Sequence, residues 1–263
     1  MATRSTRNRL AAPLRTSVRK GFEAVGVYVS RFPPPTFNNH VKHLLESLDI
    51  NCVFDVGAHH GRFAGKLRML GYAGRIVSFE PTADSYRVLT DAMEGDADWR
   101  GYQMALSDRD AVGEIQIMRH SDLNSLQPVS EYGRQTTRIR GLEQLASQPV
   151  ALRRLDGLFD EITSGIASPR VFLKVDTQGH DAHVIAGATA SLPRVLALQT
   201  EMASRHLYQG VASFGQALAT YESLGYVPTG FFPVTVESDD LTVIEWDCVF
   251  KRVDPQNDRP ERA

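Results

Sequence analysis

The chain has few cysteines, no long apolar run and no secretory leader pattern. Its two cysteines, Cys52 and Cys248, lie far apart in apolar strand-like runs, so we interpret them as buried free thiols suited to a reducing cytosol. No apolar run approaches the ~20 residues that cross a bilayer, and the first residues lack the apolar core of a secretory signal. The sequence therefore predicts a cytoplasmic protein.

Basic residues are outnumbered by acidic residues outside the first segment, although the net charge is only −2. Residues 1–31 carry seven basic residues and one acidic residue, a balance of +6, which leaves −8 for the rest of the chain. Neutralising the phosphates of a nucleic acid requires a basic face. The acidic main body therefore argues against a nucleic-acid enzyme, and we expect no nucleic-acid partner.

The basic segment has the apolar pattern of an amphipathic helix. Six apolar residues repeat at spacings of three and four and form one stripe: Leu10, Leu14, Val18, Phe22, Val25 and Val29. Three prolines at 33–35 end any helix. The stripe either brings residues 1–31 to an anionic membrane or packs on the enzyme itself or on a second subunit. The oligomeric state stays open.

Strand and helix signals alternate after residue 50. Apolar strand-like runs occupy 52–56, 75–80, 102–106, 171–176 and 195–201, and helical patterns occupy 61–71, 82–93 and 181–192. Continuous apolar strands separated by helices are typical of a parallel sheet covered on both faces. Two final runs, 225–236 and 244–252, predict an antiparallel hairpin. The predicted fold is α/β, with a seven-stranded, mostly parallel sheet.

This organisation predicts three parts of the chain. A basic helical extension covers 1–45, a main domain covers 46–253, and a disordered tail covers 254–263. Within the main domain, residues 107–170 separate the third strand from the fourth. Long insertions in compact domains are usually lids or substrate loops, and we expect this one to be such a lid.

Residues 52–67, CVFDVGAHHGRFAGKL, have the pattern of a strand, a tight turn and a helix. A dinucleotide-binding turn would place glycines at 57, 59 and 62, but the chain has Gly57, His59 and Arg62 there. The second glycine normally lets the backbone approach a pyrophosphate. His59 therefore argues against a ligand that contains pyrophosphate.

The second strand ends at Glu80, 23 residues after Gly57. An acidic side chain at this place accepts hydrogen bonds from ribose hydroxyls. A ribose without pyrophosphate, beside the acidic Asp55, fits S-adenosylmethionine, whose sulfonium and amino groups are cationic. Gly57 would let the methionine part lie close. The alternative for the glycine turn alone is a purely structural tight turn.

Several segments together resemble one family: VFDVGAHHGRFAGKLRMLGY, IVSFEP, MALSD, LKVDTQGHDAHVIAGA, LQTEMASRHLYQG and EWDCVFKR. Over about residues 50–252 the chain resembles the FkbM family of methyltransferases. The resemblance implies a Rossmann-like class I methyltransferase fold and S-adenosylmethionine as cofactor. It also implies methylation of a hydroxyl, often on a sugar of a glycolipid, polysaccharide or antibiotic, and hence a role in glycan biosynthesis.

The resemblance also implies positions for the ligands. It places the cofactor at six residues: Asp55, Gly57, Gly61, Glu80, Ser107 and Asp108. It places the acceptor beside Asn124 and Ser125 of the insertion and beside His206 after the fifth strand. Hydroxyls of a sugar would hydrogen-bond to Asn124 and Ser125.

LKVDTQGHD, residues 173–181, carries the candidate catalytic groups. Methyl transfer to a hydroxyl removes the hydroxyl proton, and a positioned base contributes typically about 10²–10⁴-fold. We predict His180 as that base, with Asp176 orienting either His180 or the acceptor, and His60 as the second candidate. Against this stands the commoner role of a single histidine, as a satisfied surface or core residue.

Lys174 lies in the same central strand and needs a partner, which we expect to be Glu201, a residue that would also shape the acceptor pocket. Gln178 stands where the family commonly has a glutamate. A catalytic divalent metal is not favoured, because no tight ligand spacing accompanies the five candidate ligands Asp176, His180, Asp181, Glu201 and His206.

Three functions compete at this stage. The first is an S-adenosylmethionine-dependent O-methyltransferase acting on a sugar hydroxyl. The second is a nucleoside-binding module without catalysis, and the third is an NAD-dependent oxidoreductase, against which the absent pyrophosphate glycines argue. The sequence leaves open which acceptor and which hydroxyl would be methylated.

Overall fold

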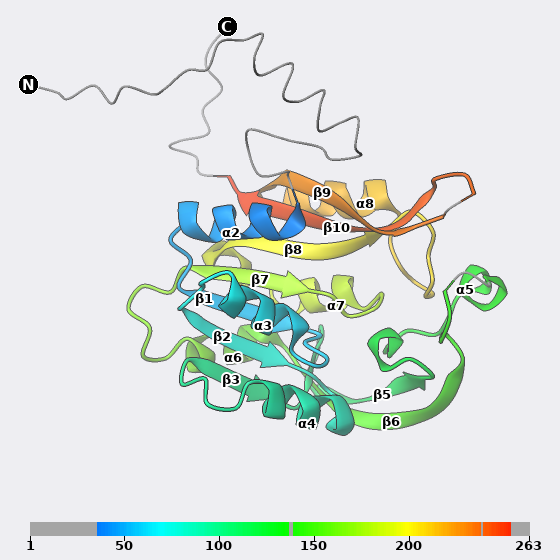
Figure 1. Cartoon of the computed structure of the whole chain (residues 1–263), viewed down its shortest axis with the longest axis horizontal. Helices are drawn as coiled ribbons and strands as arrows, with labels where there is room; N and C mark the ends of the chain where they lie inside the picture. The colour runs from blue at the N-terminus through cyan, green and yellow to red at the C-terminus, as the bar shows by residue number, and fades with distance from the viewer. Residues whose placement is uncertain (1–35, 137–138, 238, 254–263) are drawn as a thin grey trace, which may run out of the picture.

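The main element of the structure is a seven-stranded sheet (Figure 1). The computed structural model describes residues 36–136, 139–237 and 239–253. The strand order is β3-β2-β1-β7-β8-β10-β9. The strands are β1 (Cys52–Val56), β2 (Arg75–Phe79), β3 (Trp99–Tyr102), β7 (Val171–Val175), β8 (Val195–Ala203), β9 (Tyr226–Val236) and β10 (Val243–Arg252).

Only β10 runs antiparallel to its neighbours, β8 and β9. The prediction of a seven-stranded, mostly parallel sheet with a terminal antiparallel hairpin is therefore confirmed. The hairpin folds so that its second strand enters the sheet and its first strand, β9, forms the edge. This order is that of class I methyltransferases, as predicted.

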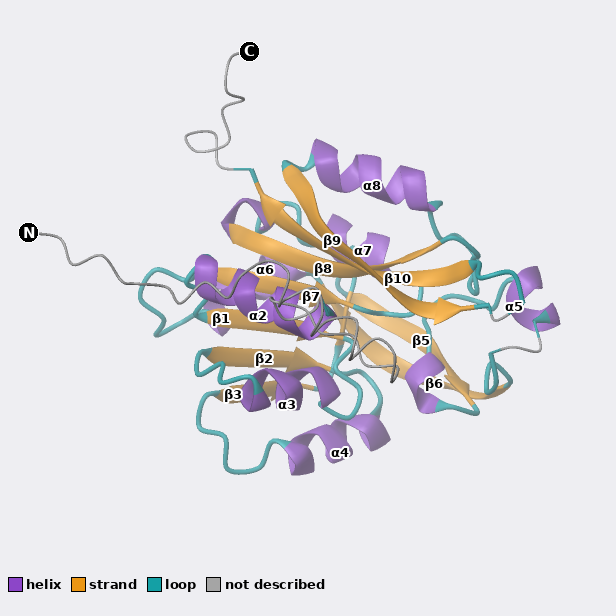
Figure 2. Ribbon diagram, turned by 45° about the horizontal axis from the view of Figure 1, so that its top comes forward, coloured by secondary structure: helices purple, strands orange, loops and turns teal. Residues whose placement is uncertain are grey.

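Helices cover both faces of the sheet (Figure 2). Three pack with one hydrophobic core: α2 (Phe37–Ser47), α3 (Arg62–Met69) and α4 (Ala83–Ala92). Three pack with the other: α6 (Leu155–Ile162), α7 (Asp181–Ala186) and α8 (Phe214–Ser223). Both faces of the central strands are consequently buried, which explains why those strands read as continuous apolar runs.

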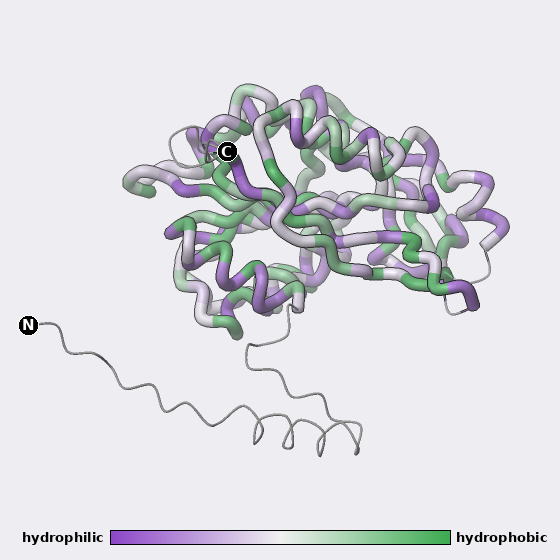
Figure 3. Tube along the Cα trace, turned by 90° about the horizontal axis from the view of Figure 1, so that it is seen from above, coloured by the Kyte–Doolittle hydropathy of each residue, from purple (hydrophilic) through white to green (hydrophobic). Residues whose placement is uncertain are grey.

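Side-chain alternation along β1 distributes its residues between the two cores. Phe54 and Val56 belong to the core beneath α6, α7 and α8, whereas Val53 belongs to the core beneath α2, α3 and α4. The helices alternate hydrophobic and hydrophilic residues along their length (Figure 3). Cys52 and Cys248 are buried free thiols, as predicted.

A second sheet of three strands lies beside the carboxyl ends of the main strands. It has the order β4-β6-β5 and consists of β4 (Ala105–Leu106), β5 (Ala111–Met118) and β6 (Gln144–Arg153). The predicted third strand, 102–106, was wrong in its bounds, because the chain leaves the main sheet after Tyr102. Ala105 and Leu106 pair with Leu152 and Arg153 of β6 instead.

The predicted insertion, 107–170, contains β5, β6 and two short helical segments, η1 (Ser121–Leu123) and α5 (Glu131–Gln135). It also contains α6, which belongs to a layer of the main sheet. A further short helix, η2 (Leu192–Arg194), precedes β8. The predicted N-terminal helix and the predicted C-terminal tail lie outside the described residues. Among the described residues, no helix has the length and apolar character needed to cross a membrane.

Candidate active site

A cavity lies at the carboxyl ends of β1, β2 and β7. Five of the predicted site residues line it: Gly57, Glu80, Asn124, Asp176 and His180. Ligands bind at this edge in open α/β sheets. The loop after β5 supplies the opposite wall, through Ser121, Asp122, Asn124 and Leu126.

Glu80 follows β2 directly, and its side chain is held by three hydrogen bonds. Oε1 accepts from the backbone N of Thr82 (2.9 Å) and from its Oγ1 (2.6 Å), and Oε2 accepts from the backbone N of His59 (3.0 Å). The residue is 6% exposed. Because a carboxylate accepts about four hydrogen bonds, Glu80 is fixed in place and still has capacity on Oε2 for a ligand hydroxyl.

The turn after β1 has left-handed backbone at Gly57 (φ 74°) and at His59 (φ 49°). A Cβ on Gly57 would lie 1.9 Å from the carbonyl oxygen of Asp176. Gly57 is therefore required by the packing of two strand ends as well as by its conformation. His59 lines the cavity, and its Nε2 is 2.8 Å from Ser121 Oγ, so it closes the turn against the loop after β5.

The charge of the cavity is entirely acidic. Glu80, Asp122 and Asp176 line it, and none of the described residues in its wall is a lysine or an arginine. The remaining wall is largely apolar, formed by Phe79, Pro81, Leu106, Ile115 and Leu126. Such a cavity suits a flat apolar ring and a cationic group, and it is unfavourable for phosphates.

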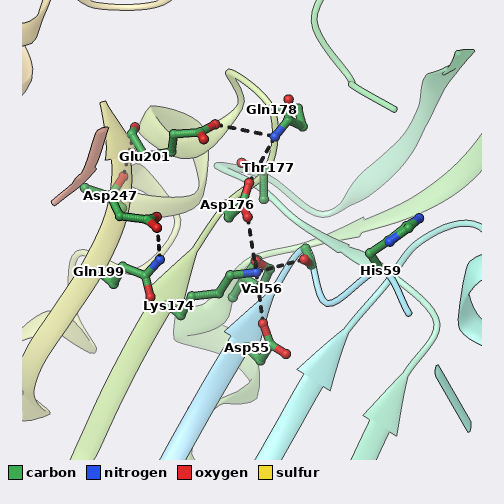
Figure 4. A network of polar contacts seen from close by, with 12 residues as sticks. Asp55, Val56, His59, Lys174, Asp176, Thr177, Gln178, Gln199, Glu201 and Asp247 are labelled. Carbon is green, nitrogen blue, oxygen red and sulfur yellow. Dashed lines mark hydrogen bonds and ion pairs between the residues drawn. The ribbon is translucent and has the colours of Figure 1, made fainter. Parts of the chain in front are cut away.

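Lys174 pairs with Asp55, which corrects the expectation that Glu201 would be its partner. Lys174 Nζ lies 3.0 Å from Asp55 Oδ1 and 3.6 Å from Asp176 Oδ2, and it donates to the carbonyl oxygen of Gly57 (2.9 Å) (Figure 4). The physical reason is register, since Asp55 and Lys174 are neighbours across β1 and β7. Burial alone lowers the pKa of Lys174, but the Asp55 and Asp176 carboxylates outweigh it and raise that pKa.

Asp55 is fully buried and does not line the cavity. Its place behind the cavity, against Lys174, differs from the direct cofactor contact that we expected. A buried carboxylate next to a buried ammonium balances its charge locally. The pair thereby holds the carboxyl ends of β1 and β7 together beneath the cavity.

Gln178 bridges Asp176 and Glu201, as Figure 4 shows. Its Nε2 donates to Asp176 Oδ1 at 3.1 Å and to Glu201 Oε2 at 3.4 Å, and its Oε1 accepts from Tyr208 OH at 3.2 Å. The backbone of Gln178 is left-handed (φ 53°). The Asp176 side chain is 36% exposed and faces the cavity, so it is the catalytic candidate most accessible to a second substrate.

A catalytic base needs a ring nitrogen that is open to the acceptor, but both ring nitrogens of His180 are within hydrogen-bond distance of protein side chains. Its Nε2 lies 2.9 Å from Ser107 Oγ and its Nδ1 lies 2.9 Å from Gln127 Nε2. Ser107 Oγ also donates to Asp108 Oδ1 at 3.2 Å. The consistent assignment is a neutral imidazole that donates from Nε2 to Ser107 and accepts the Gln127 amide at Nδ1.

Burial, with a smaller effect of nearby His183, lowers the pKa of His180 to about 4. The residue is only 5% exposed, and its ring stacks on that of His183 at 4.4 Å. At neutral pH His180 is therefore uncharged, and both of its ring nitrogens are already hydrogen-bonded. His60, the second candidate, stacks on His59 at 3.6 Å and does not line the cavity.

Further carboxyl groups lie on the β8 and β10 side of Asp176. Burial, then repulsion from Asp176 and other acidic neighbours, raises the pKa of Glu201 well above its usual range. The same causes raise the pKa of Asp247 to about 6 and contribute to raising that of Glu245 to about 7. Asp247 is opposite Glu201 in the β8–β10 ladder. Asp247 and Glu245 were not predicted as site residues, because their proximity depends on β10 entering the sheet.

The other predicted residues take supporting positions. Gly61 is the left-handed residue that precedes α3 (φ 76°). Asp108 accepts from His183 Nδ1 (3.0 Å), and Ser125 Oγ donates to the carbonyl oxygen of Gln178 (2.6 Å).

Asn124 Oδ1 accepts from the backbone N of Met118 (2.8 Å), which occupies that oxygen within the loop. The carbonyl oxygen of His206 accepts from Ser130 Oγ, and Glu201 lines a second hollow between α7 and α8.

Sequence reasoning missed three contributors from the loop after β5: Ser121, Asp122 and Gln127. Each contacts the cavity or a residue that lines it. Their only sequence signal was their place in a long polar insertion, which does not specify which side chains turn inward. Within the described ranges, no group of three His, Cys, Asp or Glu residues has the geometry to hold a metal ion.

Comparison with known proteins places the chain in one family. The Methyltransferase FkbM domain matches residues 55–228. No protein of curated function matches the sequence.

Several solved structures are similar at low identity. An rRNA methylase from Streptococcus thermophilus is 9% identical, with a TM-score of 0.44, over 86% of this chain and 100% of its own. TrmK of M. capricolum in complex with S-adenosyl-homocysteine is 9% identical, with a TM-score of 0.43, over 82% and 68%. A precorrin-6y C5,15-methyltransferase from Geobacter metallireducens is 12% identical, with a TM-score of 0.41, over 85% and 93%.

The family match includes the end of β1, the turn after it, Glu80, and the segment from Lys174 to His180. It covers more than half of the chain, and the residues in it form the cavity described above. The chain therefore belongs to the FkbM family of methyltransferases.

Proposed function

We propose that the protein is an S-adenosylmethionine-dependent O-methyltransferase that acts on a hydroxyl of a sugar. The observation that carries the proposal is the charge of the cavity, which has three carboxylates and, among its described wall residues, no lysine or arginine. A dinucleotide would bring a pyrophosphate into this acidic space, whereas S-adenosylmethionine brings a cation. The family match supports methyl transfer as the reaction.

The residues of the cavity fit the parts of this cofactor. Glu80, fixed by Thr82 and the His59 backbone, offers Oε2 to the ribose hydroxyls. The apolar wall that includes Leu106 and Ile115 accommodates the adenine. Asp176 provides a carboxylate for the cationic end. When bound, the cofactor supplies a methyl group on a positively charged sulfur.

Asp176 is proposed to accept the proton of the acceptor hydroxyl. With the cofactor bound, the acceptor oxygen would take the methyl group as its bond to sulfur breaks, and the hydroxyl proton would pass to the Asp176 carboxylate. Lys174 and Gln178 hold that carboxylate through Oδ2 and Oδ1, respectively. His180 is proposed to act as a positioning residue, because the neutral, hydrogen-bonded ring connects the turn after β7 to Gln127 and Ser107.

A polyhydroxylated acceptor fits the surroundings of Asp176. Gln178, Glu201 and Tyr208 form a chain of hydrogen-bonding groups beside it. Where Glu201 is protonated it both donates and accepts, which suits neighbouring hydroxyls of one sugar ring. The resemblance to sugar O-methyltransferases supports the same acceptor class.

The test has two arms. Calorimetry on the full-length protein is expected to show binding of S-adenosylhomocysteine and no binding of NAD. Incubation with S-adenosylmethionine and a panel of sugars, followed by mass spectrometry, is expected to show addition of one methyl group to oxygen. The matched control is the deoxy sugar that lacks the modified hydroxyl, which should gain none. Binding of NAD, or methylation that survives removal of every free hydroxyl, contradicts the proposal.

A further inference from the structure

A second hollow lies between α7 and α8, on the β8 side of the candidate active site. Small residues line much of it and leave space that larger side chains would fill: Gly179, Ala182, Ala203, Ala212 and Ala217. Ile185, Met202 and Val211 add larger apolar side chains. Such a lining, mostly apolar with a few polar groups, is typical of a small-molecule site. We call it the α7–α8 hollow.

The turn after β7 separates the α7–α8 hollow from the cavity of the candidate active site. Asp176 and Gln178 line the cavity, and the following Gly179 lines the hollow. Gln178 connects the two spaces, because its Nε2 donates to Asp176 Oδ1 (3.1 Å) and to Glu201 Oε2 (3.4 Å), and Glu201 lines the hollow (Figure 4). The hollow therefore begins one side chain away from Asp176, the proposed acceptor of the hydroxyl proton.

Gly179 brings the loop after β8 against this turn. Its backbone is left-handed (φ 87°), and a Cβ on it would lie 2.9 Å from Tyr208 Cβ and 3.0 Å from Val211 Cγ2. The glycine therefore allows a close approach, through which Tyr208 OH reaches Gln178 Oε1 (3.2 Å) and Val211 lines the hollow. The loop after β8 thus contacts the turn that the two spaces share.

Two acidic residues are among the polar lining of the hollow, Asp181 and Glu201. Both oxygens of Asp181 accept hydrogen bonds from the protein, Oδ1 from the backbone N of Thr177 (2.9 Å) and Oδ2 from Thr200 Oγ1 (2.9 Å). Glu201 Oε2 accepts the Gln178 amide at 3.4 Å, a long hydrogen bond that leaves the carboxyl group with capacity for a ligand hydroxyl. Glu201 is therefore the polar group that a ligand would meet between the hollow and Asp176.

The charge of the hollow limits what it can hold. Among the described residues that line it there is no lysine, arginine or histidine. A phosphate or carboxylate placed there would lie near Asp181 and Glu201 without a cation to balance its charge. This argues against the diphosphate of a nucleotide sugar and favours a neutral apolar group joined to hydroxyls.

We propose that the α7–α8 hollow binds the apolar aglycone of the acceptor, a neutral glycoside, while the sugar lies between Glu201 and Asp176. The proposal rests on the proposed function of the cavity, because the sugar presents its hydroxyl to Asp176. It narrows the acceptor class to glycosides with an apolar aglycone. Each methylene of such a group that leaves water for the hollow raises the affinity about fourfold.

Paired glycosides test the proposal. Hexyl and methyl glycosides of glucose, galactose and mannose are compared as acceptors of the full-length protein with S-adenosylmethionine. For the same sugar, kcat/KM should be at least about tenfold higher for the hexyl than for the methyl glycoside, since two or more additional methylenes would be buried. UDP-glucose, UDP-galactose and GDP-mannose should be poorer acceptors than the hexyl glycosides. A hexyl-to-methyl ratio near one, or a nucleotide sugar that is the better acceptor, overturns the proposal.

Filling the hollow locates the effect. Ala217→Leu on α8 and Ala182→Leu on α7 narrow the hollow from its two helices, and each should lower the hexyl-to-methyl ratio at least about fivefold, because the leucine takes the space of buried methylenes. The matched control is Ala219→Leu, which adds the same side chain at an exposed position of α8 and should keep the ratio. Because the ratio compares two acceptors in one variant, a general loss of folded protein does not change it. A wild-type ratio in both filled variants places the aglycone elsewhere and overturns the proposal.

A binding measurement separates this proposal from the proposed function. Calorimetry on the protein saturated with S-adenosylhomocysteine compares the same hexyl and methyl glycosides without turnover. Tighter binding of the hexyl glycosides, lost in Ala217→Leu and Ala182→Leu, without methylation of any glycoside contradicts the proposed function and supports the hollow as a ligand site. Methylation with equal affinity for the hexyl and methyl glycosides supports the proposed function and contradicts the aglycone site.

Discussion

The buried carboxylates on the two sides of Asp176 have different neighbours. On the β1 side, Asp55 lies against the Lys174 ammonium at 3.0 Å, and Glu80 is held by three hydrogen bonds. On the β8 and β10 side, Glu201, Asp247 and Glu245 are near one another, and their pKa values are raised. Burial also raises the pKa of Asp55, but the Lys174 ammonium opposes that rise, whereas the acidic neighbours of Glu201 add to the rise in its pKa.

The two groups of carboxylates on either side of Asp176 therefore have different roles. On the β1 side, the Asp55–Lys174 pair and the hydrogen-bonded Glu80 lie next to a cavity that suits a cationic cofactor. The β8 side retains protons that neighbouring hydroxyls can share. Asp176 lies at the boundary, bound by Lys174 from one side and by Gln178 from the other (Figure 4).

The largest expected effect comes from breaking the ion pair. Lys174→Met should leave Asp55 as an uncompensated buried charge and lower the free energy of unfolding by about 3–5 kcal/mol. Urea titration at pH 7 measures it. The double variant Lys174→Met with Asp55→Asn removes both charges and should recover a large part of the loss. A change below about 1 kcal/mol in the single variant would show that the pair is not needed for charge balance.

The second prediction separates Asp176 from His180. At saturating S-adenosylmethionine, Asp176→Asn should reduce methyl-transfer turnover at least about 10²-fold, since the group that takes the proton is lost. His180→Gln should have a smaller effect and should keep the pH dependence of the wild type, because the pKa of His180 is already about 4. If His180→Gln loses as much turnover as Asp176→Asn and also loses that pH dependence, His180 is the base.

The third and smallest effect concerns the protonated side. The pKa of Glu245 is about 7 in the folded protein, against an ordinary value of 4.5. Between these values the folded state binds more protons than the unfolded state, so this contribution to stability is present at low pH and is lost as pH rises through about 7.

Glu245→Gln should therefore reduce the difference in unfolding free energy between pH 5 and pH 8 by about 1–3 kcal/mol. Urea titrations at the two pH values measure it, with the exposed Glu222→Gln as the control. An unchanged difference would mean that Glu245 is ionised in the folded protein.

The sequence contained enough to predict the main sheet. The strand β1 follows the predicted bounds, because an apolar run ending in Asp55, Val56 and Gly57 has few alternatives. The bounds of β3 could not be predicted. Ala105 and Leu106 are apolar, and their apolar character is compatible with pairing either to β2 or to β6. The choice depends on long-range pairing, which periodicity does not report.

The sequence was sufficient to predict where the site lies in the fold, but not which side chains contact each other there. Glu80 and Asp176 follow strand ends, and the fold brings such ends together. The partner of Lys174 was predicted wrongly, because β7 has two neighbours and only the three-dimensional register shows that Asp55 is directly opposite. The contact of Gln127 with His180 joins residues far apart in the sequence and has no local signal.

The central claim is that the cavity beside Glu80 binds S-adenosylmethionine. Calorimetric titration of S-adenosylhomocysteine into the wild type and Glu80→Ala tests it most directly, since no acceptor is needed. We expect the substitution to weaken binding by about 1–3 kcal/mol, the cost of leaving ligand hydroxyls without their charged partner. Equal affinity in a folded Glu80→Ala variant would place the ribose elsewhere and contradict the account.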